Sequence, residues 1–323
     1  MINDHVNPHY VNEKYVVYYD ENYHQSWIYP EATKQLIEYF TSEDRIHKFT
    51  KLNADDLLIW IMERLKPKKD RNVNCINTVI VFSQDMVPDK IAPDFSPSVI
   101  LRKYLDNGGR IVWIGDIPFW RQGKVKKKHV EWNVGGIFSI LGLNPDFNYS
   151  PKGKVTITQL GLEYGLKTPW YGSRPIQEKG GSDGLKDLAT TYVNYPKEPK
   201  IIKPKGVAPE VTIETFVSKA SNLWNLLLPI FIAFGSYIGL EQNITITIIS
   251  FIVTGIIVYI FRNYFKIKEL VYPDKYTSAW IKNFNLKYPF SGFIRIWDRQ
   301  IYYLNEEELK EIYDVAFYKL HEN

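Results

Sequence analysis

The sequence predicts an α/β fold in which helices cover both faces of a mostly parallel, doubly wound sheet. Short runs of β-branched and aromatic residues alternate with amphipathic helical patterns, as they do in βαβ units. The run NTVIVFSQD, at 77–85, is almost continuously apolar, as expected of a strand buried on both faces. The segment LDNGGRIVWIGD passes from a predicted helix through two glycines into a second strand of this kind. Together these observations favour a flavodoxin-like order of strands.

Each predicted element has a local signal. Strands are predicted where β-branched and aromatic residues cluster, at 14–20, 45–52, 77–85, 110–116 and 291–298. Helices are predicted at 30–40, 54–65, 96–109, 131–143 and 305–320. Pro30 opens the first helix, Asn53 and Asn305 are suited to cap two others, and Gly108 is a stop signal.

The middle of the chain is less regular. A strand is predicted at 154–161, a loop at 168–176 and a short helix at 183–193. A linker rich in proline and lysine is then predicted at 196–222. The last strand and helix cannot bury a core alone, so 276–323 is expected to complete the α/β domain whose main part is 1–195.

The segment 223–265 predicts a transmembrane helical hairpin. Its two apolar stretches, 223–240 and 244–261, are each 18 residues long without a charged side chain, and three polar residues connect them. Each stretch is just long enough to span a bilayer core as a helix, about 27 Å. A hydrophobic hairpin buried in a soluble core is the alternative. Lysines and arginines flank the hairpin on both sides, which predicts a multi-pass protein with both termini and the globular domain in the cytoplasm.

Composition excludes several classes of function. The single cysteine, Cys75, rules out an intramolecular disulfide framework and a cysteine-rich zinc site. The six histidines show no metal-binding spacing, so no metal is expected. Neither a dinucleotide fingerprint nor a phosphate loop is present, and no cofactor is predicted. The net charge of +4 is mild, and no nucleic-acid partner is predicted.

Candidate site residues follow from the rule that ligands of doubly wound sheets bind beyond the carboxyl ends of the strands. The candidates for ligand binding are Asp20, His24, Trp27, Ser83, Gln84, Asp85, Gly115, Asp116, Trp120, Trp170, Arg174 and Asp298. Within this set, Asp85 and Asp116 are candidates for an acid/base pair or for holding a hydroxylated ligand, and His24 is a candidate base. The alternative for each is a capping or loop-bracing role.

The runs NTVIVFSQD and LDNGGRIVWIGDIPF resemble the middle of class I glutamine-amidotransferase-like domains, and especially the ThuA-like branch. The resemblance covers residues 14–143, with GFIRIWD as a possible closing strand. It implies a nucleophilic cysteine at the elbow after the fourth strand, but 115–119 contains none and Cys75 precedes the third strand. No G-x-S-x-G motif replaces it. The resemblance therefore implies a domain that has lost its catalytic residues.

Three functions remain open at this stage. The first is a membrane-anchored, catalytically degenerate domain that binds a small ligand or a protein partner. The missing nucleophile favours binding over catalysis. The second is a hydrolase or sugar-modifying enzyme that uses Asp85, Asp116 and His24. The third is a structural subunit of a membrane complex. The expected partners are the lipid bilayer, a membrane protein, and a small polar or sugar ligand.

Overall fold

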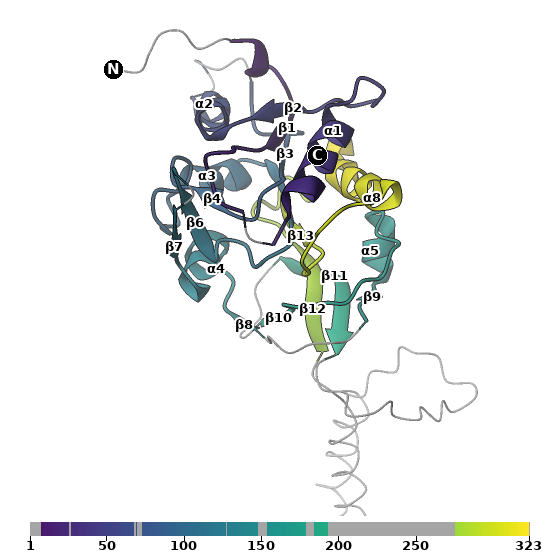
Figure 1. The fold of residues 1–323 in the computed structure, drawn as a ribbon. Helices are drawn as coiled ribbons and strands as arrows, with labels where there is room; N and C mark the ends of the chain where they lie inside the picture. The colour runs from purple at the N-terminus through teal and green to yellow at the C-terminus, as the bar shows by residue number, and fades with distance from the viewer. Residues whose placement is uncertain are drawn as a thin grey trace, which may run out of the picture. The chain divides into compact units, whose positions relative to one another are not determined.

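A ten-stranded mixed sheet forms the centre of the protein in the computed structural model (Figure 1). The structure describes residues 8–25, 27–67, 69, 73–126, 128–147, 154–178, 184–192 and 275–322. Along its main path the strands follow the order β2-β1-β3-β5-β13-β12-β10-β8, and β11 and β9 branch from β12.

Five neighbouring strands of this sheet are parallel. They are β2 (Thr50–Leu52), β1 (Tyr15–Tyr18), β3 (Val79–Phe82), β5 (Arg110–Ile114) and β13 (Gly292–Ile296). All residues of β3, β5 and β13 are buried, because helices cover both faces of these strands. The strand β13 comes from the C-terminal part of the chain and pairs directly with β5, with Gly292 opposite Arg110.

The other five strands are joined by antiparallel pairing. They are β12 (Lys275–Lys282), β11 (Leu185–Tyr192), β10 (Ile176–Glu178), β9 (Thr156–Ile157) and β8 (Pro145–Phe147). The prediction of a helix at 183–193 is wrong, because β11 pairs with β12 from Leu185 to Tyr192. These ladder hydrogen bonds join segments far apart in the sequence, and they override the local helical pattern.

A small sheet lies beyond the carboxyl ends of the parallel strands. It consists of β4 (Val87–Pro88), β6 (Arg121–Lys124) and β7 (Lys128–Glu131). The hairpin of β6 and β7 is antiparallel, and Gly123 lies opposite His129.

Helices cover the parallel strands on both faces. The helices are α1 (Pro30–Thr41), α2 (Ala54–Leu65), α3 (Ile100–Asp106), α4 (Val134–Leu141), α5 (Gln159–Glu163) and α8 (Glu306–Phe317), with short 3₁₀ turns η1 (Pro8–Tyr10) and η3 (Leu320–Glu322). The apolar residues of α1 and α8 pack on one face, and those of α2, α3 and α4 pack on the other. The Asn53 side chain caps α2, and Asn305 forms a capping box with Glu308 at the start of α8.

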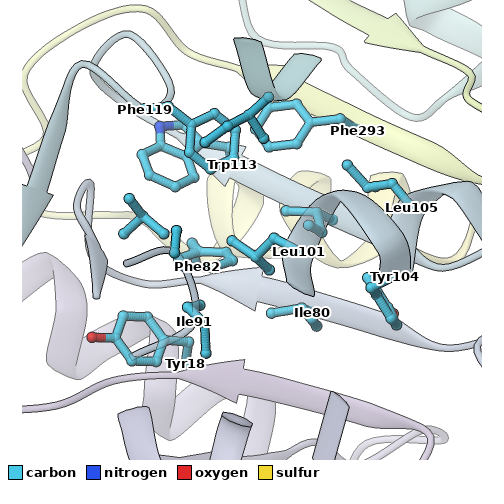
Figure 2. Close-up of a cluster of buried hydrophobic side chains, with 14 of the residues drawn as sticks. Tyr18, Ile80, Phe82, Ile91, Leu101, Tyr104, Leu105, Trp113, Phe119 and Phe293 are labelled. Atoms are coloured by element: carbon cyan, nitrogen blue, oxygen red, sulfur yellow. The ribbon is translucent and has the colours of Figure 1, made fainter. Parts of the chain in front are cut away.

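Successive side chains of the parallel strands point alternately to the two faces of the sheet, into one apolar core and then into the other. Figure 2 shows the core on the side of α3, where Ile80, Phe82 and Trp113 from the strands meet Leu101 from the helix. The rings of Phe82 and Trp113 lie 5.1 Å apart, centroid to centroid. The alternation of strand side chains thus fixes both helix layers against one sheet.

The predicted fold class is wrong in two respects. The sheet is not mostly parallel, because β8 to β12 join it by antiparallel pairing. The predicted transmembrane hairpin is also unsupported: in the described ranges, no helix is long and apolar enough to cross a membrane. The longest of these helices have 12 residues, or about 18 Å, against about 30 Å of bilayer core.

The prediction of a multi-pass membrane location is corrected for the same reason, since it depended on that hairpin. The segment 223–265, on which the prediction fell, lies outside the described residues, and so does the predicted linker at 196–222.

Candidate functional site

A hollow of about 520 Å³ opens at the carboxyl ends of β1 and β3. Polar and aromatic side chains from the loop after β1, the start of α1 and the end of β3 form its lining. The lining residues are Tyr19, Glu21, Tyr23, His24, Gln25, Ile28, Tyr29, Pro30 and Gln84.

The topology of the sheet explains why a hollow forms there. The chain leaves β1 through α1 on one face of the sheet, and it leaves β3 toward α3 on the other face. The loops after β1 and β3 therefore diverge toward opposite faces of the sheet. In α/β sheets this switch point is where ligands bind.

Backbone hydrogen bonds hold the floor of the hollow. The Gln84 side chain accepts a hydrogen bond from the backbone N–H of Asp20 (2.9 Å) and donates one to its carbonyl oxygen (3.0 Å). The Asp20 carboxylate accepts from the backbone N–H groups of Asn22 and Ala54. Asp20 therefore braces the loop after β1 against the start of α2, and Gln84 joins the ends of β1 and β3.

The β6–β7 hairpin borders the hollow on one side. A Cβ atom on Gly123 would lie 2.9 Å from the Tyr23 ring, so the β6 backbone rests directly on this lining residue. The rings of His24 and His129 stack with centroids 5.8 Å apart. The Tyr23 hydroxyl donates to Asp89 (2.8 Å), and burial together with this bond raises the pKa of Tyr23.

A second group of polar side chains lies at the carboxyl ends of β5 and β13, and we call it the ionic cluster. Its members are the buried Asp116, Arg295 and Asp298 and the half-buried Arg174. The Arg174 guanidinium contacts the Asp116 carboxylate at 2.5 Å. Arg295 donates to the carbonyl oxygens of Arg174 (3.0 Å) and Gly115 (3.2 Å).

Asp298 anchors the loop that carries Arg174. Its carboxylate accepts hydrogen bonds from the Trp170 indole N–H (2.6 Å) and from the backbone N–H of Arg174 (3.2 Å). The Arg174 guanidinium also stacks over the Trp27 ring, 4.1 Å from its centroid, and the backbone N–H of Trp27 donates to Asp85 (2.8 Å). One loop arginine therefore links the ends of β1, β5 and β13.

Burial shifts the pKa values of the ionic cluster. Desolvation raises the pKa of Asp298 to about 6, although Arg295 and three hydrogen bonds to the carboxylate oppose this shift. Desolvation also raises the pKa of Asp116, and the neighbouring Arg174 opposes it. The pKa of Arg295 is lowered, again because the side chain is fully buried. These shifts follow the rule that a low-dielectric interior disfavours the charged form.

Two turns with left-handed backbone place the carboxylates of the cluster. Gly115 follows β5 with φ of +85°, and Trp297 follows β13 with φ of +52°. The N–H of Gly115 donates to the carbonyl oxygen of Trp297 (3.1 Å), which joins the two turns. For a bulky residue such as Trp297, positive φ is strained and requires support from the surrounding structure.

The structure separates the residues predicted from the sequence into groups. His24 and Gln84 line the hollow, whereas Asp116, Arg174 and Asp298 belong to the ionic cluster. Four more of the predicted residues contact that cluster or are joined to it: Trp27, Asp85, Gly115 and Trp170. The Ser83 hydroxyl donates to the carbonyl oxygen of Tyr18 within the sheet (2.6 Å). Trp120 packs against the apolar core.

The predicted acid/base roles stay predictions. The Asp85 carboxylate is close enough to contribute to the raised pKa of Asp116. Asp116 also accepts a hydrogen bond from the backbone N–H of Ile117 (2.7 Å) and contacts Arg174. These contacts are those of a bracing carboxylate, while His24 lies in the lining of the hollow.

The sequence analysis missed all three tyrosines of the hollow and one of its two glutamines. Tyr19, Tyr23, Gln25 and Tyr29 all lie between the end of β1 and Pro30, which opens α1. Because Pro30 marks the start of α1, it also marks the whole loop between β1 and α1 as the rim of a switch point. The complete loop was therefore a better candidate for ligand binding than single residues in it. Within the part of the chain that the structure describes, no group of three metal-ligating side chains occurs.

The fold and the hollow define an α/β domain with a crevice at the switch point of its parallel strands. By sequence, the chain belongs to the MJECL34 family, whose family model matches residues 13–196. It is 31% identical over 174 residues to a protein of Methanocaldococcus jannaschii named uncharacterized protein MJECL34. This match covers 53% of the chain and 54% of the relative, so the chain spans about half the length of the relative it matches.

The resemblance to glutamine-amidotransferase-like and ThuA-like domains is therefore corrected to membership of the MJECL34 family. The motifs that suggested it, a buried strand and a helix ending in Gly-Gly before a second strand, serve packing in any parallel α/β sheet. The predicted function, a membrane-anchored and degenerate amidotransferase, depended on this resemblance and on the hairpin. It is wrong because both of these predictions are corrected.

Proposed function

We propose that the protein binds a small hydroxylated ligand, of the size and chemistry of a sugar, in the hollow at the ends of β1 and β3. The observation that supports this proposal most strongly is the coincidence of an open hollow of about 520 Å³ with the switch point of the parallel strands. A volume of this size lies in the range of small-molecule sites.

The lining suits hydroxyl groups. Glu21 supplies a carboxylate acceptor, Gln25 supplies an amide, and the phenol of Tyr19 adds a group that both donates and accepts. The Tyr19 ring offers a flat apolar surface that suits the C–H face of a sugar ring. A ligand with many hydroxyls and an apolar face therefore satisfies more of this lining than a purely apolar or a strongly anionic one.

The ionic cluster supports the hollow without lining it. Arg174 pairs with Asp116 and stacks on Trp27. The stacking contact positions the loop that ends in the lining residue Ile28. Rigid support of this kind lowers the entropy that a binding loop loses when it receives a ligand.

The proposal is tested by NMR titration of the full chain with D-ribose, D-glucose and myo-inositol. We expect at least one of the three to bind, and we expect Glu21→Ala to weaken that binding about tenfold by removing a charged acceptor. Glu38→Ala is the matched control, because Glu38 is also exposed but lies along α1 away from the lining. Absence of binding by all three compounds would overturn the proposal, as would equal effects of the two variants.

A further inference from the structure

Two tyrosine rings stack at the mouth of the hollow. Tyr29, from the start of α1, and Tyr302, from the loop after β13, have ring centroids 4.3 Å apart and an interplanar angle of 28°. Both are exposed: Tyr29 retains 38% and Tyr302 retains 54% of its accessible surface. Large aromatic side chains gathered on a surface beside a hollow commonly mark a binding surface.

The backbone holds this pair in place. The N–H of Tyr29 donates to the carbonyl oxygen of Ile301 (2.9 Å), and the N–H of Ile301 donates to the carbonyl oxygen of Trp27 (2.8 Å). Ile28 and Ile301 form an isolated parallel bridge, and both are buried. The Tyr302 hydroxyl donates to the Gln300 side chain (2.9 Å). Neither ring is needed to fill the core, so the pair is ordered at the surface by the backbone beneath it.

Tyr29 belongs to both features, since it lines the hollow and stacks on Tyr302. Tyr302 therefore backs the Tyr29 ring and holds it as a flat wall at the rim. The site therefore combines two surfaces of different chemistry, a preorganised aromatic wall and a hollow lined with hydrogen-bonding groups. The hollow suits a sugar, and the wall suits a planar ring attached to that sugar.

We propose that the ligand is of the nucleoside type, a planar heteroaromatic ring joined to a sugar, with its ring stacked on Tyr29 and its sugar in the hollow. This inference rests on the proposed binding of a hydroxylated ligand and adds the second half of that ligand. In it Tyr29 contacts the ligand, and Tyr302 is a positioning residue that acts through Tyr29.

The experiment compares adenosine, adenine and D-ribose as probes of the full chain by calorimetric and NMR titration. We expect adenosine to bind more tightly than either of its parts. Tyr29→Ala should weaken adenosine binding by roughly five- to hundredfold, the range that loss of one base–aromatic stack produces, and should change ribose binding far less. Tyr29→Phe should retain most of the affinity, because the ring is kept.

Tyr302→Ala should weaken adenosine binding by a smaller factor, about threefold. Tyr302→Phe keeps the ring and should bind adenosine as the natural chain does. Tyr303→Ala is the matched control: Tyr303 is the next residue, is 65% exposed, and does not line the hollow. Thermal unfolding of each variant shows that the fold persists, since only exposed rings are changed.

The outcomes separate the two proposals. If ribose binds, adenosine binds no more tightly and Tyr29→Ala has no effect, then the nucleoside inference is wrong and the hydroxylated-ligand proposal stands. If neither adenosine nor ribose binds and the other sugars also fail, both are wrong. If adenosine alone gains affinity from the two tyrosines and not from Tyr303, the inference is supported.

Discussion

The hollow and the ionic cluster lie at the same edge of the sheet, yet they differ in what their polar groups do. In the hollow, groups such as Glu21 and Tyr29 are exposed, so they keep their contact with water. In the cluster, Asp116, Arg295 and Asp298 are buried, and their partners are other protein groups. Charged residues at this edge of the sheet can therefore be structural, and the exposed fraction of a side chain distinguishes the two regions more clearly than the residue type does.

The largest expected effect comes from removing a buried carboxylate of the cluster. Asp298→Ala removes the carboxylate that interacts most strongly with the buried Arg295 guanidinium, and it leaves the Trp170 indole N–H without its acceptor. We expect the free energy of unfolding to fall by about 3–5 kcal/mol, measured by urea unfolding. Asp44→Ala, at an exposed position, should change it by less than about 0.5 kcal/mol. Similar losses from the two variants would show that the cluster is not structural.

The pH dependence of stability sharpens the comparison further. Burial holds the pKa of Asp298 at about 6, above the value of about 3.9 in an unfolded chain. The folded state therefore binds this proton more tightly, and the free energy of unfolding should rise as pH falls from about 7 to about 4. The contribution of Asp298 is about 2–3 kcal/mol over that window.

Asp298→Asn isolates this contribution, because the amide cannot titrate and its oxygen can still accept from Trp170. The difference in stability between the natural chain and this variant should change with pH between about 4 and 7. A difference that is constant over this window would contradict the raised pKa.

A smaller effect is expected where the cluster meets the loop of the hollow. Trp27→Ala removes the ring beneath the Arg174 guanidinium, and the cation–π contact contributes about 0.5–2 kcal/mol. A double-mutant cycle with Arg174→Met should give a coupling energy of about 1 kcal/mol in urea unfolding. A coupling near zero would show that the two side chains stabilise the protein independently, and that the cluster does not support this loop.

Local signals made part of the fold predictable. Asn53 and Asn305 cap α2 and α8, and Pro30 opens α1, because each signal depends on residues within one helical turn. The β3 strand, Val79–Phe82, lies within the predicted apolar run. The same local reasoning failed at β11, where the pattern 183–193 favoured a helix and pairing with β12 produced a strand.

The site was predictable only in outline. Strand-end residues such as Asp116 and Asp298 were correctly placed at the edge, since parallel strands end there. Their partner Arg174 comes from a loop whose position depends on Trp170 and on the C-terminal strand β13. A sequence does not show that these segments meet. The carboxylates were therefore predicted to bind a ligand, whereas in the structure arginine side chains lie beside them.

The buried strands and the ends of several helices follow from the local sequence, because apolar runs and capping residues act over a few neighbouring positions. Three features become visible only in the folded protein: β13 pairs with β5, half of the sheet is antiparallel, and Tyr29 meets Tyr302 beside the hollow. These contacts join residues far apart in the chain. Their free energy comes from hydrogen bonding and burial in the folded protein, which no local pattern specifies.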